Sequence, residues 1–407
     1  MKMAQAKLSR EVGVALLLFY GLGNILGAGI YVLVGKVAGI AGYFSIFAFV
    51  LACVILVFTA LSYAELVSRY PVSAGAAVYI EEGIGVRSLS IGVGLMMAVA
   101  GLVSAATIAH GFAGYLRQFV YIDTSLSMII LIAVLVTIAI LGIKASVVVA
   151  GILTVVEILG LLLIIYYGFD TISMPLVNYK ELIPQLRFSD ISVIFLGAFL
   201  AVYAFLGFED MVNIAEEVRE PSKTFPLAII LALGISTLLY ILIVFVALQT
   251  LSLNELQHST APFADIYKKL TGRDPLVISM IATFAVINGA LIQLIMASRI
   301  VYGMATKGWL PSSLAQVSSR TKTPIYSTVL VGLITIAFAL LFELVALASY
   351  TSMLILIVFT LINISLIRIK SAKPLPQGVM NIPLWVPWAG MLLNLLLITA
   401  KLFFDKG

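Results

Sequence analysis

The sequence is poor in cysteine, histidine and charge. Its 407 residues include one cysteine, Cys53, and two histidines. One cysteine excludes an intrachain disulfide, and so few thiols and imidazoles argue against a metal cluster. Charged residues make up only 11% of the chain, against about 25% in soluble domains, which excludes an ordinary soluble globule. The net charge of +5 needs no nucleic-acid partner, since basic loops of a membrane protein account for it.

Hydrophobic residues are abundant and arranged in long uncharged segments. They make up 62% of the chain, and the mean hydropathy is +1.16. A helix of about 20 residues crosses the hydrocarbon of a bilayer. The sequence therefore predicts an all-α integral membrane protein with about eleven transmembrane helices, at residues 12–37, 43–67, 88–119, 126–143, 145–168, 191–212, 225–251, 275–306, 325–342, 344–367 and 382–404.

The loop charges predict the orientation. With the amino terminus in the cytoplasm, the inner segments carry 15 of the 24 basic residues, as the positive-inside rule requires. The first apolar span is too long for a signal peptide and lacks a small-residue cleavage site, so we expect a retained helix. Eleven spans then place the carboxyl terminus, including Lys406, outside the cell.

Four glycines interrupt the first span, in the stretch Gly21–Tyr31. Glycine costs roughly 1 kcal/mol in a helix interior, so this density predicts a broken helix; close helix packing is the alternative. Open backbone at membrane depth is tolerated only beside protein or a water-filled cavity. A second half-helix beginning near Gly27 directs its amides and positive dipole end into such a cavity, where a carboxylate can bind.

The sixth span repeats the anomaly, because its apolar run stops at Phe208, just before Glu209 and Asp210. A helix that simply ends at Phe208 is the alternative. Paired interruptions in spans one and six are typical of two inverted five-helix repeats with a substrate site at the midplane. We therefore expect a first repeat at 1–168, an inverted second repeat at 191–367 and an extra helix at 382–407.

Four motifs occur in order along the chain, at Gly27–Tyr31, Pro71–Tyr79, Tyr203–Pro226 and Arg299–Pro311. They resemble the motifs of the amino acid-polyamine-organocation (APC) superfamily of permeases, which have the leucine-transporter-type inverted-repeat fold. The resemblance covers nearly the whole chain, although most members have twelve helices rather than eleven.

The resemblance implies an amino acid site built largely from backbone groups around Gly27. It implies that the substrate carboxylate meets the amides of Ala28 and Gly29. The ammonium group meets the carbonyls of Ile25, Tyr203 and Leu206. Phe205 and Phe208 are expected to shape or gate this pocket, with plain packing as the alternative.

Glu157 is the most unusual single residue, because it lies midway along the fifth span. An ionised acid there costs at least about 2.5–3.5 kcal/mol, so intramembrane acids are read first as functional. Thr154, Glu157 and Gly160 share one helix face. We expect Glu157 to bind the coupling proton near Gly23; sodium with Ser298, or a structural hydrogen bond, are the alternatives.

These features predict a secondary transporter in the cell membrane that carries amino acids, neutral ones first, by proton symport and alternating access. Amino acid exchange and sodium symport are the alternatives within this class. A membrane-embedded enzyme is disfavoured because no hydrolytic triad, aspartate dyad or phosphate-binding loop is present, and a channel because no selectivity motif appears. No cofactor is expected. The particular amino acid and the oligomeric state stay open.

Overall fold

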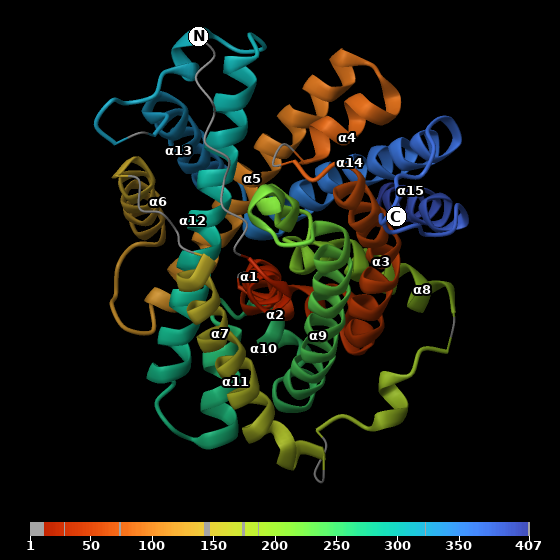
Figure 1. Cartoon of the computed structure of the whole chain (residues 1–407). Helices are drawn as coiled ribbons and strands as arrows, with labels where there is room; N and C mark the ends of the chain where they lie inside the picture. Colours follow the sequence, from red (N-terminus) through yellow and green to blue (C-terminus); the bar gives the residue numbers. More distant parts are fainter. Residues whose placement is uncertain are drawn as a thin grey trace.

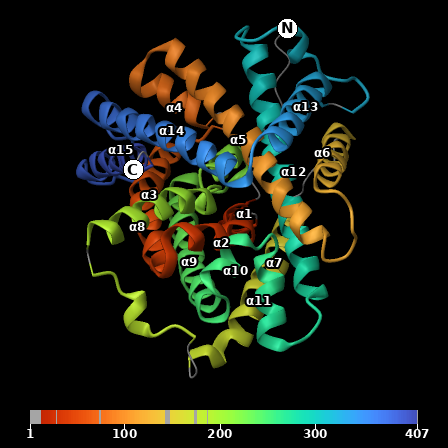
Figure 2. The ribbon, with the colours of Figure 1, turned by 180° about the vertical axis from the view of Figure 1, so that it is seen from behind.

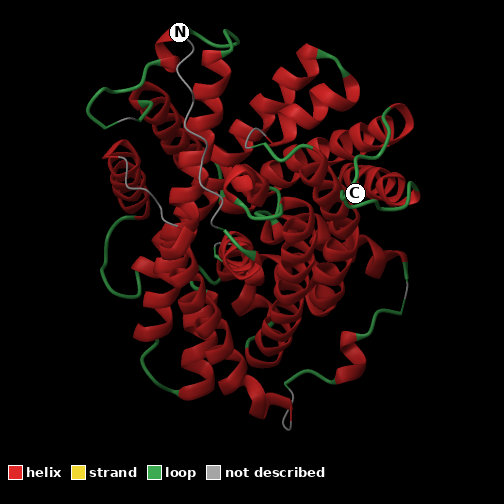
Figure 3. Cartoon of the chain, viewed as in Figure 1, coloured by secondary structure: helices red, strands yellow, loops and turns green. Residues whose placement is uncertain are grey.

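The computed structural model describes residues 12–27, 29–72, 75–141, 147–172, 176–185, 187–321 and 323–405. Across these residues the chain is helical, with one isolated backbone bridge between Val12 and Val218 in place of any strand (Figure 3). The α-helices are α1 (Val14–Leu26), α2 (Gly29–Ala41), α3 (Ser45–Arg69), α4 (Gly75–Ile84), α5 (Arg87–Leu116), α6 (Thr124–Leu141), α7 (Val147–Gly168), α8 (Phe188–Val202), α9 (Pro221–Thr250), α10 (Leu253–His258), α11 (Pro262–Thr271), α12 (Leu276–Thr306), α13 (Ile325–Leu341), α14 (Leu344–Ala372) and α15 (Trp385–Phe404). The 3-10 helices are η1 (Gly42–Phe44), η2 (Phe169–Ile172), η3 (Tyr179–Leu182), η4 (Tyr203–Phe205), η5 (Asp210–Glu217) and η6 (Ser312–Ala315).

The described helices match the eleven predicted spans one by one. Within the described residues, nine segments are long and apolar enough to cross a membrane, and one of them joins α2 to α3. The helices α1 and α13 are shorter apolar helices. Span one is the pair α1 and α2, and span six is α8 continued by η4 and η5. The span prediction is therefore confirmed, including the two interrupted helices.

Three helices outside the spans were not predicted. Helix α4 lies above the α1–α2 pair in Figure 1, and α10 and α11 lie below it, as they also do in the reverse view of Figure 2. The short helix α10 is held by a capping box in which Ser252 and Glu255 bond each other reciprocally. The hydrogen bond from the backbone N–H of Ser252 lowers the pKa of Glu255.

The interrupted helix α1–α2 occupies the middle of the bundle, with α7, α9 and α12 around it (Figure 1). The larger of two buried apolar clusters surrounds it and extends into α3, α8, α9 and α14. The smaller cluster joins α5, α6, α12 and α13. The broken helix is thus enclosed by protein, which is the condition for exposing backbone groups at membrane depth.

Helix α15 is tied to the bundle by a buried polar cluster. The side-chain amide of Asn363 in α14 donates to the Thr59 hydroxyl at 2.9 Å and accepts from Ser62 at 2.7 Å. Asn394 of α15 donates to the same Thr59 oxygen at 3.0 Å. Hydrogen bonds of this kind join helices inside a bilayer, where the hydrophobic effect does not drive helices together. The eleventh span is therefore an integral part of the packed bundle.

A second cluster, of charged groups, joins α3, α14 and the segment before α15. Glu65 is fully buried and forms ion pairs with Arg69 at 2.6 Å and Lys370 at 2.9 Å. The backbone N–H of Ile382 also donates to Glu65, at 2.9 Å. A buried carboxylate with this many charge-assisted partners is compensated, whereas removal of its charge leaves two cations unpaired.

We predict that Glu65→Gln lowers the free energy of unfolding by about 3–5 kcal/mol, because it breaks a buried ion pair on one side only. The matched control is Glu82→Gln, whose partner Lys373 lies 2.6 Å away in a pair that is about 40% exposed. An exposed pair of that kind contributes less than about 1 kcal/mol. Thermal unfolding of the detergent-solubilised variants measures both, and equal shifts would refute the assignment.

Candidate functional site

The first helix break lies between Gly27 and Gly29. Helix α1 ends at Leu26, and the N–H of Gly27 still bonds the Gly23 carbonyl at 3.1 Å. Helix α2 begins at Gly29. Ala28, a predicted carboxylate ligand, is outside the described residues. The N-terminal end of α2 therefore opens at the predicted position, with its free amides and positive dipole end at the break.

The second break begins at Tyr203, earlier than the apolar run suggested. Helix α8 ends at Val202, η4 follows, and Leu206 is extended. Gly207 has φ +128°, a conformation that side chains rarely tolerate. A Cβ there would lie 2.7 Å from the backbone carbon of Asn24 in α1. Glycine at 207 is thus required both by its φ angle and by the approach of the first helix.

The two breaks face each other. A Cβ at Gly29 would strike the Cα of Ala204 and lie 2.9 Å from the Ala204 carbonyl oxygen. The Tyr240 hydroxyl of α9 lies 2.7 Å from the carbonyl oxygens of both Ile25 and Ala204. One hydroxyl hydrogen is shared between one carbonyl from each broken helix. Tyr240 gave no signal in the sequence, because a tyrosine in an apolar span reveals neither its partner nor its direction.

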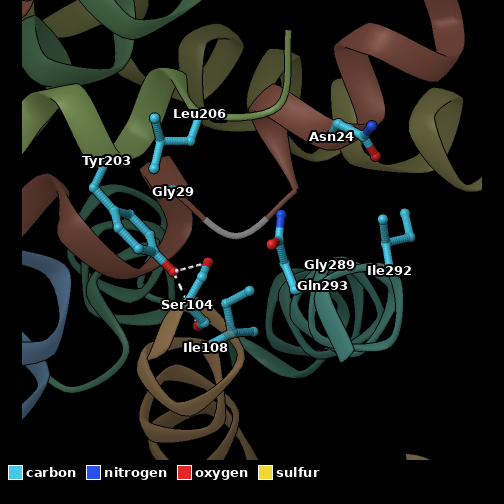
Figure 4. Close-up of a pocket in the computed structure, with 9 residues that line it drawn as sticks. All are labelled: Asn24, Gly29, Ser104, Ile108, Tyr203, Leu206, Gly289, Ile292 and Gln293. Carbon is cyan, nitrogen blue, oxygen red and sulfur yellow. Dashed lines mark hydrogen bonds between the residues drawn. The ribbon is translucent and has the colours of Figure 1, made fainter. Parts of the chain in front are cut away.

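A small pocket opens beside the two breaks (Figure 4). Helix α5 contributes Ser104, whose hydroxyl lies 2.9 Å from that of Tyr203. Gln293 of α12 points toward the break between α1 and α2 (Figure 4). The side-chain amide of Asn24 has no hydrogen-bond partner within the described chain. The pocket is lined by Asn24, Gly29, Ser104, Ile108, Tyr203, Leu206, Gly289, Ile292 and Gln293.

This pocket unites only part of the predicted substrate set. Gly29, Tyr203 and Leu206 line it, whereas the Ile25 carbonyl accepts the Tyr240 hydroxyl instead. Phe205 and Phe208 lie outside the lining and are fully buried. The Phe205 ring packs 5.0 Å from that of Tyr240, and the Phe208 ring 5.3 Å from that of Phe359, between centroids. Both phenylalanines thus pack against aromatic side chains of neighbouring helices, outside the pocket lining.

Glu157 of α7 lies beside the first break. It is 1% exposed, and its Oε1 is 3.5 Å from the side-chain nitrogen of Asn288 in α12. Its Oε2 has no partner in the described residues. A Cβ at Gly27 would lie 3.7 Å from Oε1, so the carboxyl group adjoins the break. A long contact to one neutral amide leaves this acid weakly compensated.

The face of α7 that carries Glu157 packs on both halves of the first helix. Thr154 donates to the Phe19 carbonyl of α1 at 3.0 Å and also contacts Gly23. The Tyr31 hydroxyl of α2 donates to the Glu157 carbonyl at 2.7 Å. A shift of either half-helix relative to the other therefore changes the surroundings of Glu157.

Ser298 is not brought to this position. Its hydroxyl bonds the Ile295 carbonyl of its own helix at 2.7 Å. It lies ten residues beyond Asn288 in α12, which corresponds to roughly 15 Å along the axis. Asn288 was visible in the sequence only as a polar residue in an apolar span, and helix register alone did not show that it faces Glu157.

Both halves of the first broken helix are tied to neighbouring segments. Just before α1, Val12 and Val218 form a backbone bridge, and the N–H of Arg219 donates to the Val12 carbonyl at 2.9 Å. In α2, the Lys36 ammonium donates to the carbonyls of Gln257 at 2.6 Å and Ser259 at 3.1 Å. A movement of either half therefore has to break or carry these contacts with it.

Comparison with known proteins decides the family. Residues 13–407 match the family model described as amino acid permease. The chain belongs to the amino acid permease family, within the APC superfamily. It is therefore a multi-span membrane transporter and not an enzyme.

Several permeases with named substrates are similar to the chain. The branched-chain amino acid permease BcaP of Bacillus subtilis (strain 168) is 27% identical, over 92% of this chain and 84% of its own. The methylthioribose transporter of the same organism is 26% identical, over 93% and 86%. A vacuolar cationic amino acid transporter 2 of Arabidopsis thaliana is 29% identical, over 90% of this chain and 61% of its own.

We predict that Gly29→Val reduces amino acid uptake by roughly a hundredfold or more, because the new side chain separates the two breaks by an ångström-scale shift. The matched control is Gly234→Val in α9, where nothing lies within 4 Å of the added Cβ. Uptake is measured in proteoliposomes with both variants matched for insertion and monodispersity. Normal uptake by the inserted Gly29→Val protein would remove this break from the site.

Proposed function

We propose that the protein imports neutral amino acids across the cell membrane with a proton, by alternating access around the pocket between the two breaks. The facing breaks are the observation that supports this proposal most directly. They place the N-terminal end of α2 and the residues Tyr203 and Leu206 beside one pocket, where backbone groups can meet the two charged groups shared by all amino acids. The amino terminus lies in the cytoplasm in this arrangement.

The pocket lining supports a neutral substrate. Ile108, Leu206 and Ile292 supply apolar surface, and the polar lining residues Asn24, Ser104, Tyr203 and Gln293 are uncharged. A cationic side chain placed there without an acid partner loses its hydration without compensation. The name of the Bacillus branched-chain permease agrees with this proposal, whereas the names of the cationic relatives represent the alternative.

In a competition assay with labelled leucine, we predict that unlabelled isoleucine, valine and alanine compete better than lysine and arginine. The expected ratio of inhibition constants is on the order of tenfold or more, which corresponds to about 1.4 kcal/mol. Transport is measured in proteoliposomes at fixed pH. Preferential uptake of lysine or arginine would overturn the neutral assignment.

Glu157 is the residue we propose for coupling to the proton. The ionised and protonated forms of its carboxyl group favour different hydrogen-bond partners. The ionised carboxyl favours the free amides at the break, and the protonated carboxyl can donate to a backbone carbonyl there. Because α7 packs on both α1 and α2, these states favour different arrangements of the half-helices. A carrier couples an ion to a conformational change through such a difference.

We predict that Glu157→Gln removes one proton's contribution to uphill uptake. One coupled proton supports an accumulation ratio of about tenfold per unit of pH difference, so the variant should lose that factor. Counterflow exchange at equal pH should persist, because glutamine keeps the size and polarity of the side chain.

The assay compares the parent, Glu157→Gln and Ser298→Ala across a pH series, with sodium present or replaced by choline. An identical pH response in parent and Glu157→Gln, with no sodium effect, would make Glu157 structural. A sodium requirement lost in Glu157→Gln would establish sodium symport instead. Counterflow without uphill uptake in the parent would establish an exchanger.

A further inference from the structure

Two consecutive acids, Glu209 and Asp210, are buried directly after the second break. They are 4% and 2% exposed, respectively. None of the ion pairs formed among the described residues involves either carboxyl. A buried charge without a partner is costly, and two carboxylates this close repel each other strongly. Ionisation of both members of this pair at once is therefore strongly disfavoured.

Their hydrogen bonds distinguish the two acids. Oε2 of Glu209 accepts the backbone N–H of Gly207 at 2.9 Å, and that backbone is held in place by the approach of Asn24. Oδ2 of Asp210 accepts the side-chain amide of Gln293 at 3.2 Å. A donor favours the ionised form of its acceptor. The donor to Glu209 is fixed backbone, whereas the donor to Asp210 is a side chain that also lines the pocket (Figure 4).

A buried hydroxyl without a partner lies close to this segment. Tyr63 of α3 is fully buried, and its hydroxyl has no hydrogen-bond partner in the described chain. Its ring lies 6.0 Å, between centroids, from that of Phe208, which directly precedes the two acids. The Tyr79 hydroxyl of α4 is likewise unpartnered, and the two tyrosine rings are 6.1 Å apart. Hydroxyl groups both accept and donate protons. The side chains of Tyr63 and Tyr79 thus connect the segment next to the acids with helix α4.

The described residues of the helices that pack against η5 place no oppositely charged side chain in an ion pair with either acid. Helices α1, α3 and α9 pack against η5. Helix α1 has no acid, base or histidine. Glu65 of α3 is held by Arg69 and Lys370. Lys223 of α9 pairs with Glu220 at the surface, at 2.8 Å.

We propose that Asp210 is a proton-binding site, distinct from Glu157, whose occupancy is linked to the substrate pocket through Gln293. When a substrate engages the Gln293 amide, Asp210 loses its donor, and one proton from water neutralises the carboxylate. When Asp210 is protonated, Gln293 is released to bind substrate. The two ligands therefore bind cooperatively, and the linkage is reciprocal. Substrate release returns the proton to water, with Tyr63 and Tyr79 as the route.

This inference rests on the proposed amino acid substrate but not on the proposed role of Glu157. The experiment measures the dissociation constant of labelled leucine for purified protein in detergent, at a series of pH values, without any gradient. The proteins are the parent, Asp210→Asn, Glu157→Gln and the surface control Glu82→Gln. Asparagine keeps the size of Asp210 and still accepts from Gln293, but it binds no proton.

For the parent and Glu82→Gln, the dissociation constant of leucine should rise with pH. The rise should approach tenfold per pH unit in the range where each substrate binds together with one proton. For Asp210→Asn the constant should be independent of pH over that range. A parent-like slope in Asp210→Asn overturns the proposal. If only Glu157→Gln loses the pH dependence, the proposal for Asp210 is overturned and the coupling role of Glu157 is supported. If only Asp210→Asn loses the pH dependence, Asp210 rather than Glu157 is the linked proton site. A flat parent profile refutes the linkage.

If Asp210→Asn does not bind leucine, Gln293→Leu provides the test. It removes the donor and leaves the acid, so the slope should again disappear while weaker binding persists. A retained slope in Gln293→Leu contradicts the linkage. Substituting sodium or potassium for choline should have no effect on any of these constants, and a cation requirement would replace the proton by a metal cation at this site.

Discussion

Everything in this bundle depends on the need to satisfy backbone groups away from water. A bilayer offers no partner for a free amide or carbonyl, so two interrupted helices are stable only where protein encloses them. Here each break supplies the surface that the other requires. Gly29 contacts Ala204, Gly207 contacts Asn24, and the Tyr240 hydroxyl joins the carbonyls of Ile25 and Ala204. The same closure leaves the N-terminal end of α2 and the second break beside a small pocket, which is the site that we propose for the substrate.

The sequence predicted features that depend on local pattern. The eleven spans follow from hydropathy and length, and the first break from glycine density. The acids after Phe208 indicated the second break, although the α-helix already ends at Val202. The close approach of Gly207 to Asn24 of α1 is a contact between helices, which a single-span pattern does not contain. Helix periodicity also placed Thr154, Glu157 and Gly160 on one face of α7, but it did not indicate that this face contacts the first helix.

What the sequence could not supply were contacts between helices. Hydropathy does not determine the rotation of one helix against another. Asn288 rather than Ser298 therefore meets Glu157, Ser104 meets Tyr203, and Gln293 meets Asp210. Phe205 and Phe208, predicted to shape or gate the pocket, pack against Tyr240 and Phe359 and lie outside its lining, and their role as a gate stays a prediction. Each difference concerns a partner from another helix, and no single-span pattern contains that information.

Polar groups inside the bundle fall into two kinds, and the contrast explains where the molecule is rigid and where it can change state. Glu65 has two cations and a backbone donor, and Asn363 has three hydrogen bonds. Such compensated groups hold α3, α14 and α15 in one arrangement. Glu157 and Asp210 are each held by one neutral amide from the same helix, α12. A proton can compensate either carboxyl as well as a rearrangement can. Helix α12, which holds both acids through Asn288 and Gln293, also lines the pocket with Gly289, Ile292 and Gln293.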